Sequence, residues 1–252
     1  MLTRQRQDLL LAYITQHKSV QVTRLSEVFN TSISTIRRDL IELEQRGRIT
    51  RVHGGAVLVE KEDEAPILQR AAQQAEEKKR IGEAAARLVE DNDTILITGS
   101  STTEAMLPFL APKNNLTVIT NSISNAYHLT QYPHIAVVML GGWLRHAEYT
   151  VHGPLTENGI HDFHPQKFFH GIFGLCAGIG LVGSDIQEVQ TDRFLISAVP
   201  QLIILADHTK FCRPGPVRLA PIEVVTTIVT DTKAPQEEVL AIREKGVQII
   251  LV

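Results

Sequence analysis

Four short segments of the chain combine small, hydroxyl-bearing and cationic residues, the residue types that hold phosphate groups. Each segment directly follows an apolar run. Backbone amides at glycines can approach an anion closely, hydroxyls and a carboxamide can hydrogen bond to its oxygens, and a lysine supplies a point charge. Together they predict a site for a phosphorylated small molecule. The candidate residues are Gly99, Ser100, Ser101, Thr102, Thr103, Asn121, Gly141, Gly142 and Lys210.

The apolar runs that precede these segments predict the strands of one sheet. They read as continuous Val, Ile and Leu with helical stretches between most of them, which is typical of a mainly parallel, doubly wound α/β sheet covered on both faces. Ligands of such folds bind beyond the carboxyl ends of the strands, so the segments should meet at one edge. The predicted strands are 94–98, 116–120, 135–140, 169–175, 202–206, 227–229 and 248–252, and a helix is predicted over 76–90.

Near the N-terminus, residues 32–40 combine a helix start, an apolar stripe and a face of small polar and cationic residues. Thr31 or Ser32 can cap this helix by accepting a hydrogen bond from a free backbone N–H. The apolar stripe follows the helical period and consists of Ile33, Ile36, Leu40 and Leu43. Short hydroxyls and two guanidinium groups on the remaining surface can reach the base edges and phosphates of DNA.

Two further helices and a hairpin surround this segment. Helical patterns over 3–17 and 22–29 precede it, and a tight turn joins the second of them to it, as in a helix-turn-helix. After it, residues 49–52 and 56–59 read as two strands joined by a glycine turn, a wing with basic side chains. The sequence predicts a winged helix-turn-helix that contacts double-stranded DNA through Ser32, Ser34, Thr35, Arg37, Arg38, Arg48, Arg51 and His53.

Charge is distributed unevenly along the chain. Residues 1–59 carry nine Lys and Arg against five Asp and Glu, and the remaining residues carry 16 against 23. The net charge of −3 therefore hides a basic N-terminal part, which suits a partner with phosphates. Residues 60–66 are charged and end in proline, as an exposed boundary does. We predict a DNA-binding domain over 1–59, a linker over 60–75 and an effector-binding domain over 76–252.

Composition argues against several other classes of protein. No apolar run reaches the ~18 residues that span a bilayer, and the N-terminus lacks the apolar core of a signal peptide. We therefore expect a cytoplasmic protein without a membrane partner. Cys176 and Cys212 are too few and too far apart in sequence for a disulfide framework or a metal knuckle, so we interpret them as reduced packing residues.

Two other patterns suggest different chemistry. Residues 178–183 match the dinucleotide fingerprint G-x-G-x-x-G, but a long polar segment follows where that fold requires a second strand with an acidic end. His161, His164 and His170 suggest a metal site, yet no carboxylate or cysteine pattern supports them, and we favour a loop with solvated histidines. We therefore predict neither a nicotinamide cofactor nor a metal.

Taken in order, these motifs resemble the DeoR/GlpR family of bacterial transcriptional regulators over essentially the whole chain. The matching segments are 35–40, 50–55, 99–103, 120–122, 141–142 and 206–211. The resemblance implies a winged-helix domain fused to a sensor domain related to sugar-phosphate isomerases. It also implies a homo-oligomer, a homodimer or larger, that represses a sugar or polyol catabolic operon until a phosphorylated sugar or polyol releases it from its operator.

One position departs from the family pattern. Thr98 stands close to where many relatives have an acidic residue, just before the glycine and hydroxyl-rich loop. The change removes a strong acceptor for sugar hydroxyls. The phosphate-binding part of the expectation is unaffected, but the identity of the sugar is not carried over from any relative.

An active sugar-phosphate isomerase with an accessory DNA-binding domain is the alternative. Aldose–ketose isomerisation needs a general base beside the sugar carbons, and Asp207 and His208 are the candidates. The sequence has no clustered pair of acids after one strand of the kind that the resembling isomerases use. We therefore expect a regulator without catalytic activity.

Overall fold

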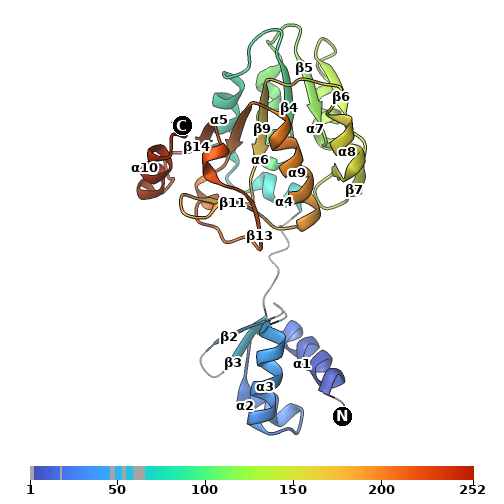
Figure 1. Ribbon diagram of the computed structural model, residues 1–252, viewed down its shortest axis with the longest axis vertical. Helices are drawn as coiled ribbons and strands as arrows, with labels where there is room; N and C mark the ends of the chain where they lie inside the picture. Colours follow the sequence, from blue (N-terminus) through green and yellow to red (C-terminus); the bar gives the residue numbers. More distant parts are fainter. Residues whose placement is uncertain (1–2, 18, 46–48, 53–54, 59–65) are drawn as a thin grey trace. The chain divides into compact units, whose positions relative to one another are not determined.

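The computed structural model describes residues 3–17, 19–45, 49–52, 55–58 and 66–252. The chain divides into two compact units, Met1–Asp63 and Glu64–Val252 (Figure 1). The first unit has one hydrophobic core, and the second unit has two.

The first unit is a winged helix-turn-helix, as predicted. Its three strands form an antiparallel sheet in the order β1-β3-β2, and Asn30, with a φ of 45°, makes the turn between the second and third helices. Leu10, Leu25, Ile36 and Leu40 meet in its core. The elements are α1 (Thr3–His17), β1 (Ser19–Gln21), α2 (Val22–Val28), α3 (Ile33–Gln45), β2 (Ile49–Val52) and β3 (Gly55–Leu58).

Helix α3 is held against α1 by a buried polar cluster around Asp39. The Asp39 side chain accepts hydrogen bonds from Arg6 Nε at 2.6 Å and from Gln7 Nε2 at 3.2 Å. Because a buried carboxylate must be paired, this cluster fixes which face of α3 turns inward. Ile33 does not belong to the buried stripe, contrary to expectation: it is 42% exposed, since it begins the helix ahead of the turn that meets the core.

The second unit is built on a seven-stranded parallel sheet with the order β15-β14-β12-β9-β4-β5-β6. The chain adds strands outward from β4 to β6, then returns to place β9 beside β4 and adds outward again to β15. The direction of strand addition therefore reverses between β4 and β9. The strands are β4 (Thr94–Ile97), β5 (Thr117–Thr120), β6 (Ala136–Met139), β9 (Lys167–Gly171), β12 (Gln201–Leu205), β14 (Thr227–Thr230) and β15 (Gln248–Leu251).

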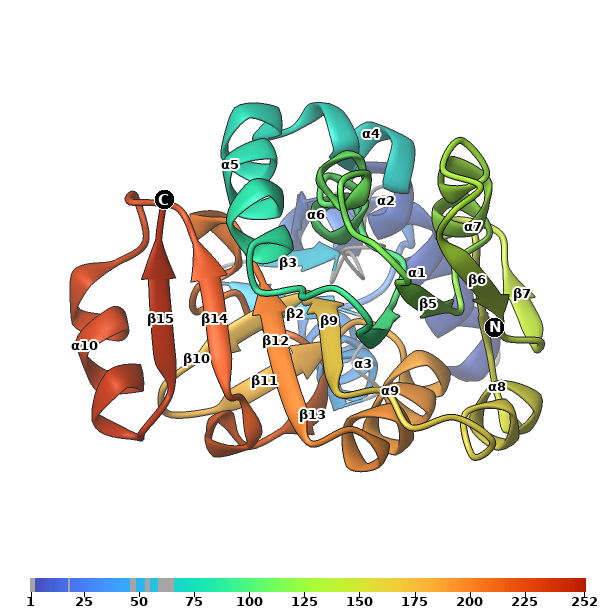
Figure 2. The same cartoon turned by 90° about the horizontal axis from the view of Figure 1, so that it is seen from above.

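Alternate residues of these strands enter two separate cores, one on each face of the sheet. In β4, Ile95 and Ile97 lie in one core while Leu96 lies in the other. Figure 2 shows α5 and α9 on opposite sides of the sheet, which confirms the predicted doubly wound α/β fold. The helices are α5 (Ala75–Ala86), α6 (Ser101–Glu104), α7 (Ile123–Leu129), α8 (Pro154–Gly159), α9 (Ile186–Ala198) and α10 (Gln236–Glu244), with 3-10 turns at Leu107–Leu110, His208–Lys210 and Ile222–Val224.

Two small antiparallel sheets accompany the main one. Strands β10 (Gly174–Cys176), β11 (Gly180–Gly183) and β13 (Val217–Ala220) form the first, and β7 (Trp143–Arg145) and β8 (Thr150–His152) form the second. The single strand predicted over 169–175 is thus divided between β9 and β10. The glycine run 178–183 makes the β10–β11 hairpin rather than a strand-to-helix turn, so it lacks the geometry of a dinucleotide site.

A short helix, α4 (Ile67–Ala72), lies within the stretch 60–75 that the sequence assigns to a linker. Ile67 and Arg70 are one turn apart and both are buried. The backbone N–H of Ile67 donates to the carbonyl of Ala147 at 3.2 Å. Helix α4 is therefore part of the second unit, and residues 59–65 lie outside the described residues.

Replacing Asp39 with alanine should destabilise the first unit. The change removes the acceptor shared by Arg6 and Gln7, and leaving such donors unsatisfied costs about 1–3 kcal/mol. In denaturant unfolding of the full chain, the first unit of Asp39→Ala should unfold at a lower denaturant concentration than that of the wild type. Glu27→Ala is the control. In the described part of the chain, the Glu27 carboxylate is exposed and forms an ion pair with Arg24 alone. A transition of Asp39→Ala as late as that of the control would contradict the bracing role of Asp39.

Candidate effector pocket and DNA-binding surface

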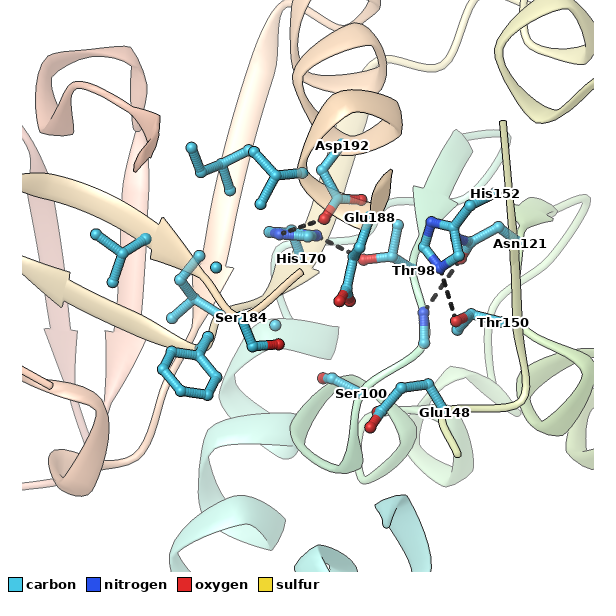
Figure 3. A pocket seen from close by; sticks show the side chains of 18 of the residues that line it. Thr98, Ser100, Asn121, Glu148, Thr150, His152, His170, Ser184, Glu188 and Asp192 are labelled. Carbon is cyan, nitrogen blue, oxygen red and sulfur yellow. Dashed lines mark hydrogen bonds and ion pairs between the residues drawn. The ribbon is translucent and has the colours of Figure 1, made fainter. Parts of the chain in front are cut away.

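A polar pocket lies at the carboxyl ends of β4 and β9, where the strand order reverses. Thr98 and Ser100 follow β4, and His170 lies near the end of β9. Figure 3 shows these side chains together with Glu148 from the β7–β8 turn and Asp192 from α9. Doubly wound sheets bind ligands at this position.

Two glycines allow the strand ends to come close together. A side chain at Gly99 would collide with Thr150, and one at Gly171 would collide with Ser100. The backbone N–H of Gly99 donates to Asn121 Oδ1 at 3.3 Å, which ties the end of β4 to the end of β5. Segments from three strands therefore share one small space.

Two buried histidines line the pocket, and both are neutral at neutral pH. His170 Nδ1 hydrogen bonds to Thr98 Oγ1 at 2.7 Å, and His152 Nε2 hydrogen bonds to Thr150 Oγ1 at 2.8 Å. Burial, with a contribution from His152, lowers the pKa of His170 to about 3. Burial and the nearby Arg145 lower the pKa of His152 to about 4. The two rings therefore offer hydrogen bonds to a ligand rather than positive charge.

The charged side chains at the pocket are balanced in pairs. Arg70 donates to Glu148, which belongs to the lining with it, and Arg145 donates to Glu188. Asp192 is 5% exposed, and burial together with the charge of Glu188 raises the pKa of its carboxyl, which favours the neutral acid. Glu148 is therefore matched by a cation within the lining, whereas the cation that matches Glu188 comes from Arg145, outside the lining.

Ser184 Oγ and His152 Nδ1 are among the buried polar atoms at the pocket that have no hydrogen-bond partner in the described part of the chain. A buried polar atom without a partner is costly, and most such atoms in proteins are satisfied. A ligand that brings polar groups to this position would remove the cost.

The structure brings part of the predicted effector set into the pocket. The predicted residues that line it are Gly99, Ser100 and Asn121. Ser101 faces a neighbouring hollow beside α5, and Thr102 and Thr103 are buried. Gly141, Gly142 and Lys210 are not in the lining. Gly142 instead packs against the side chain of Thr156 and the backbone of His152.

Several lining residues have no counterpart in the sequence prediction. They are Arg70, Glu148, Thr150, His152 and Asp192. The interpretation of His170 as a solvated loop residue is wrong, because it lies on β9 and is 5% exposed, whereas His161 and His164 are exposed as expected. A histidine inside an apolar strand pattern is itself a signal, since a buried imidazole needs partners.

The isomerase candidates do not face the pocket. The Asp207 carboxylate accepts the backbone N–H of Thr209 at 2.9 Å and so shapes the turn after β12. His208 Nδ1 lies 3.0 Å from Asp231 Oδ1. Neither Asp207 nor His208 belongs to the pocket lining.

The two cysteines are not buried packing residues, which corrects the sequence interpretation. Cys212 is exposed, and its Sγ lies 2.7 Å from Sγ of Cys176. The backbone N–H of Cys212 donates to the Leu175 carbonyl at 2.7 Å and folds this segment onto β10. Glu238 completes a group of possible metal ligands whose atoms lie within 4.8 Å of one another. Separation in sequence therefore did not predict separation in space.

In the first unit, α3 presents a polar surface that is suited to DNA. The Ser32 hydroxyl caps the helix by accepting the N–H of Thr35 at 3.3 Å. The exposed candidates are Ser32, Ser34, Arg37 and Arg38, and Thr35 is half-buried. The predicted wing contacts Arg48 and His53, and the side chain of Arg51, lie outside the described residues.

Two family models match the chain. Residues 6–62 match the DeoR-like helix-turn-helix domain, and residues 73–232 match the DeoR C terminal sensor domain. The chain belongs to the DeoR family. It is therefore a DNA-binding transcriptional regulator with a small-molecule sensor domain, which confirms the resemblance seen in the sequence.

Several relatives align with this DeoR-family chain over nearly its whole length. The HTH-type transcriptional regulator GolR of Listeria innocua is 34% identical over 91% of each chain. The glycerol-3-phosphate regulon repressor of Escherichia coli is 31% identical over 98% of each chain. The HTH-type transcriptional repressor CsqR of Escherichia coli is 30% identical over 98% of this chain and 94% of its own. These relatives are transcriptional regulators or repressors by name.

Likeness to solved structures is distant. Ribose 5 phosphate isomerase A from Neisseria gonorrhoeae aligns with 53% of this DeoR-family chain and 52% of its own, at 17% identity and a TM-score of 0.39, which supports no functional comparison. Within the described residues, no helix is both long enough and apolar enough to cross a membrane.

The neutral buried histidines should make the second unit sensitive to acid. A histidine whose pKa is lowered on folding binds a proton more readily in the unfolded state, so it destabilises the folded state as the pH falls. For His170 this loss begins near its unfolded pKa of 6.5 and continues down to its folded pKa of about 3. Between pH 7 and pH 5, the free energy of unfolding of the wild type should fall by about 2 kcal/mol more than that of His170→Gln. Thermal unfolding at both pH values measures this difference.

His164→Gln, at an exposed position, is the matched control and should follow the wild type. If His170→Gln lost as much stability between the two pH values as the wild type, the assignment of a neutral, buried His170 would be wrong.

Proposed function

We propose that this regulator is a cytoplasmic repressor of a sugar or polyol catabolic operon and that a phosphorylated sugar or polyol releases it from its operator. The observation that carries the proposal is the polar pocket at the reversal between β4 and β9, in a chain whose other unit is a DNA-binding helix-turn-helix. The name of the glycerol-3-phosphate regulon repressor agrees with a phosphorylated effector.

The pocket lining supports a ligand that carries both hydroxyls and an anion. Glu188, Asp192 and Asn121 offer oxygen acceptors or donors to sugar hydroxyls. Ser184 Oγ and His152 Nδ1 each have an unused hydrogen-bond position. The guanidinium of Arg70 is a cation that matches the geometry of a phosphoryl group.

The proposed DNA contact places α3 in the major groove. Ser34, Thr35, Arg37 and Arg38 would approach base edges and phosphates, and the wing residues Arg48, Arg51 and His53 would follow the backbone. Ser32 both caps α3 and lies on the same exposed end. A homodimer or larger homo-oligomer would present two such helices to a repeated operator.

Release requires only a modest coupling between the two sites. An effector that weakens operator binding tenfold must bind the DNA-free arrangement by about 1.4 kcal/mol more strongly than the DNA-bound one. The test is operator release: DNA selected by the protein from a random-sequence library is titrated with phosphorylated sugars and polyols and with their unphosphorylated counterparts. Release by phosphorylated compounds alone is expected. Release by none of them would contradict the proposal.

Arg37→Ala should reduce the preference for the selected operator over a mismatched site by about 1–3 kcal/mol, because arginine can bind guanine with two hydrogen bonds. Fluorescence anisotropy with both duplexes measures the preference. Arg87→Ala, which removes an exposed arginine of the second unit, should leave the preference as it is in the wild type. The same ratio of affinities in Arg37→Ala and wild type would exclude a base-reading role for Arg37.

Ser184→Ala should weaken the response to the effector by about fivefold, since one hydrogen bond to the ligand contributes about 1 kcal/mol. Operator affinity without effector should not change. Lys210→Ala is the informative comparison, because the sequence places Lys210 in the site and the structure leaves it out of the lining. We expect a normal response in Lys210→Ala. Loss of the response there, with Ser184→Ala normal, would move the effector site to the turn after β12.

A further inference from the structure

Arg70 connects the pocket to the segment of chain that leads to the DNA-binding unit. It lies on α4, the first described element after residues 59–65, and its side chain is 9% exposed in the pocket wall. Its carboxylate partner, Glu148, has a side chain that is 4% exposed and lies in the turn between β7 and β8. The ion pair therefore joins α4 to a turn that itself borders the pocket.

The position of α4 depends on this same turn. The N–H of Ile67 donates to the carbonyl of Ala147, the residue before Glu148, at 3.2 Å. At the other end of α4, Lys78 Nζ of α5 donates to the Arg70 carbonyl. Ile67, which is 2% exposed, is the buried apolar side chain of α4. The backbone bond to Ala147, the bond from Lys78 and the Arg70–Glu148 pair are polar contacts. A short helix with one apolar anchor relies on its polar contacts for its position.

A phosphorylated ligand would disturb the charge balance of this pocket. The positive charges of Arg70 and Arg145 are already matched by Glu148 and Glu188. A phosphoryl group adds up to two negative charges, so it competes with these carboxylates for their cations. Arg70 is in the pocket lining and Arg145 is not. Two parallel N–H donors of a guanidinium also fit a phosphoryl group as well as they fit a carboxylate.

Loss of Arg70 would leave Glu148 as a buried carboxylate without its cation. Such a charge is strongly unfavourable in a protein interior, which favours movement of Glu148 and its turn toward solvent. The turn carries the Ala147 carbonyl that holds the start of α4. Ligand binding and the docking of α4 therefore compete.

We propose that a phosphorylated effector takes Arg70 from Glu148, and that this exchange loosens α4 from the β7–β8 turn. The proposal rests on the proposed function and specifies how the pocket controls DNA binding. Residues 59–65 join the two units in sequence, so a shift of α4 moves the point at which the chain leaves the sensor unit. The ligand thereby favours one arrangement of the units over another.

The test uses the full-length protein and inorganic phosphate as the probe, with sodium chloride at equal ionic strength as the reference. Thermal shift measures phosphate binding, and hydrogen–deuterium exchange measures the protection of residues 67–72. In the wild type, phosphate should raise the melting temperature and increase exchange over 67–72. Exchange in 67–72 that stays the same or falls when phosphate binds would overturn the loosening of α4. Failure of phosphate to bind would overturn the exchange at Arg70.

Variants on the two sides of the ion pair should behave in opposite ways. Arg70→Gln should weaken phosphate binding about tenfold or more, because it removes a charged donor to the ligand. Glu148→Gln should strengthen phosphate binding, because it removes the competing carboxylate, and should raise exchange over 67–72 without phosphate. Arg70→Lys should restore part of the affinity. Weaker phosphate binding in both Arg70→Gln and Glu148→Gln would mean that the pair is only structural.

Lys167→Gln is the matched control. It breaks a different ion pair, the half-buried one with Asp93, at the amino end of β9 and away from the pocket. Its phosphate affinity should equal that of the wild type even where its stability is lower. If phosphorylated sugars release operator DNA equally from wild type, Arg70→Gln and Glu148→Gln, the proposed function holds and this inference fails. If they release no DNA from the wild type, the proposed function itself fails.

Discussion

Crossovers that turn to opposite faces of a parallel sheet leave a crevice between the two strands from which they depart, and here those strands are β4 and β9. The rest of the sensor unit is arranged around this crevice. Gly99 and Gly171 carry no side chain because Thr150 and Ser100 occupy the space that one would need. Strand β8 and helix α9 then close the crevice. Thr150 and His152 of β8 line it, and Asp192 Oδ2 of α9 lies 3.8 Å from Nε2 of His170 near the end of β9.

Burial of so many polar groups in one place sets the chemistry of the pocket. Low solvent access holds His152 and His170 neutral and favours the neutral form of Asp192, so the remaining charges must be matched in pairs. A pocket of this kind responds strongly to an added anion, because charges on buried side chains are only weakly screened by solvent. This sensitivity suits a sensor.

Sequence patterns predicted the architecture well because periodicity reports burial directly. The continuous apolar runs became the seven parallel strands, and the 3.6-residue period located α1 and α3. The site was predicted only in part. Gly99, Ser100 and Asn121 follow strands and so obey the rule for doubly wound sheets. Arg70, Glu148 and His152 reach the pocket from a short helix, a turn and a three-residue strand, and no local pattern shows which tertiary space such short elements will face.

In the proposed function, the pocket and the DNA-binding surface are two sites of one equilibrium. Linkage requires that each ligand change the affinity of the other by the same factor. The direct measurement is the dissociation constant of the effector, determined by calorimetry once with the free protein and once with the protein saturated by its selected operator. We predict weaker effector binding to the DNA complex, by the factor with which the effector weakens operator binding. Equal effector affinity with and without operator would show that the two sites are not coupled.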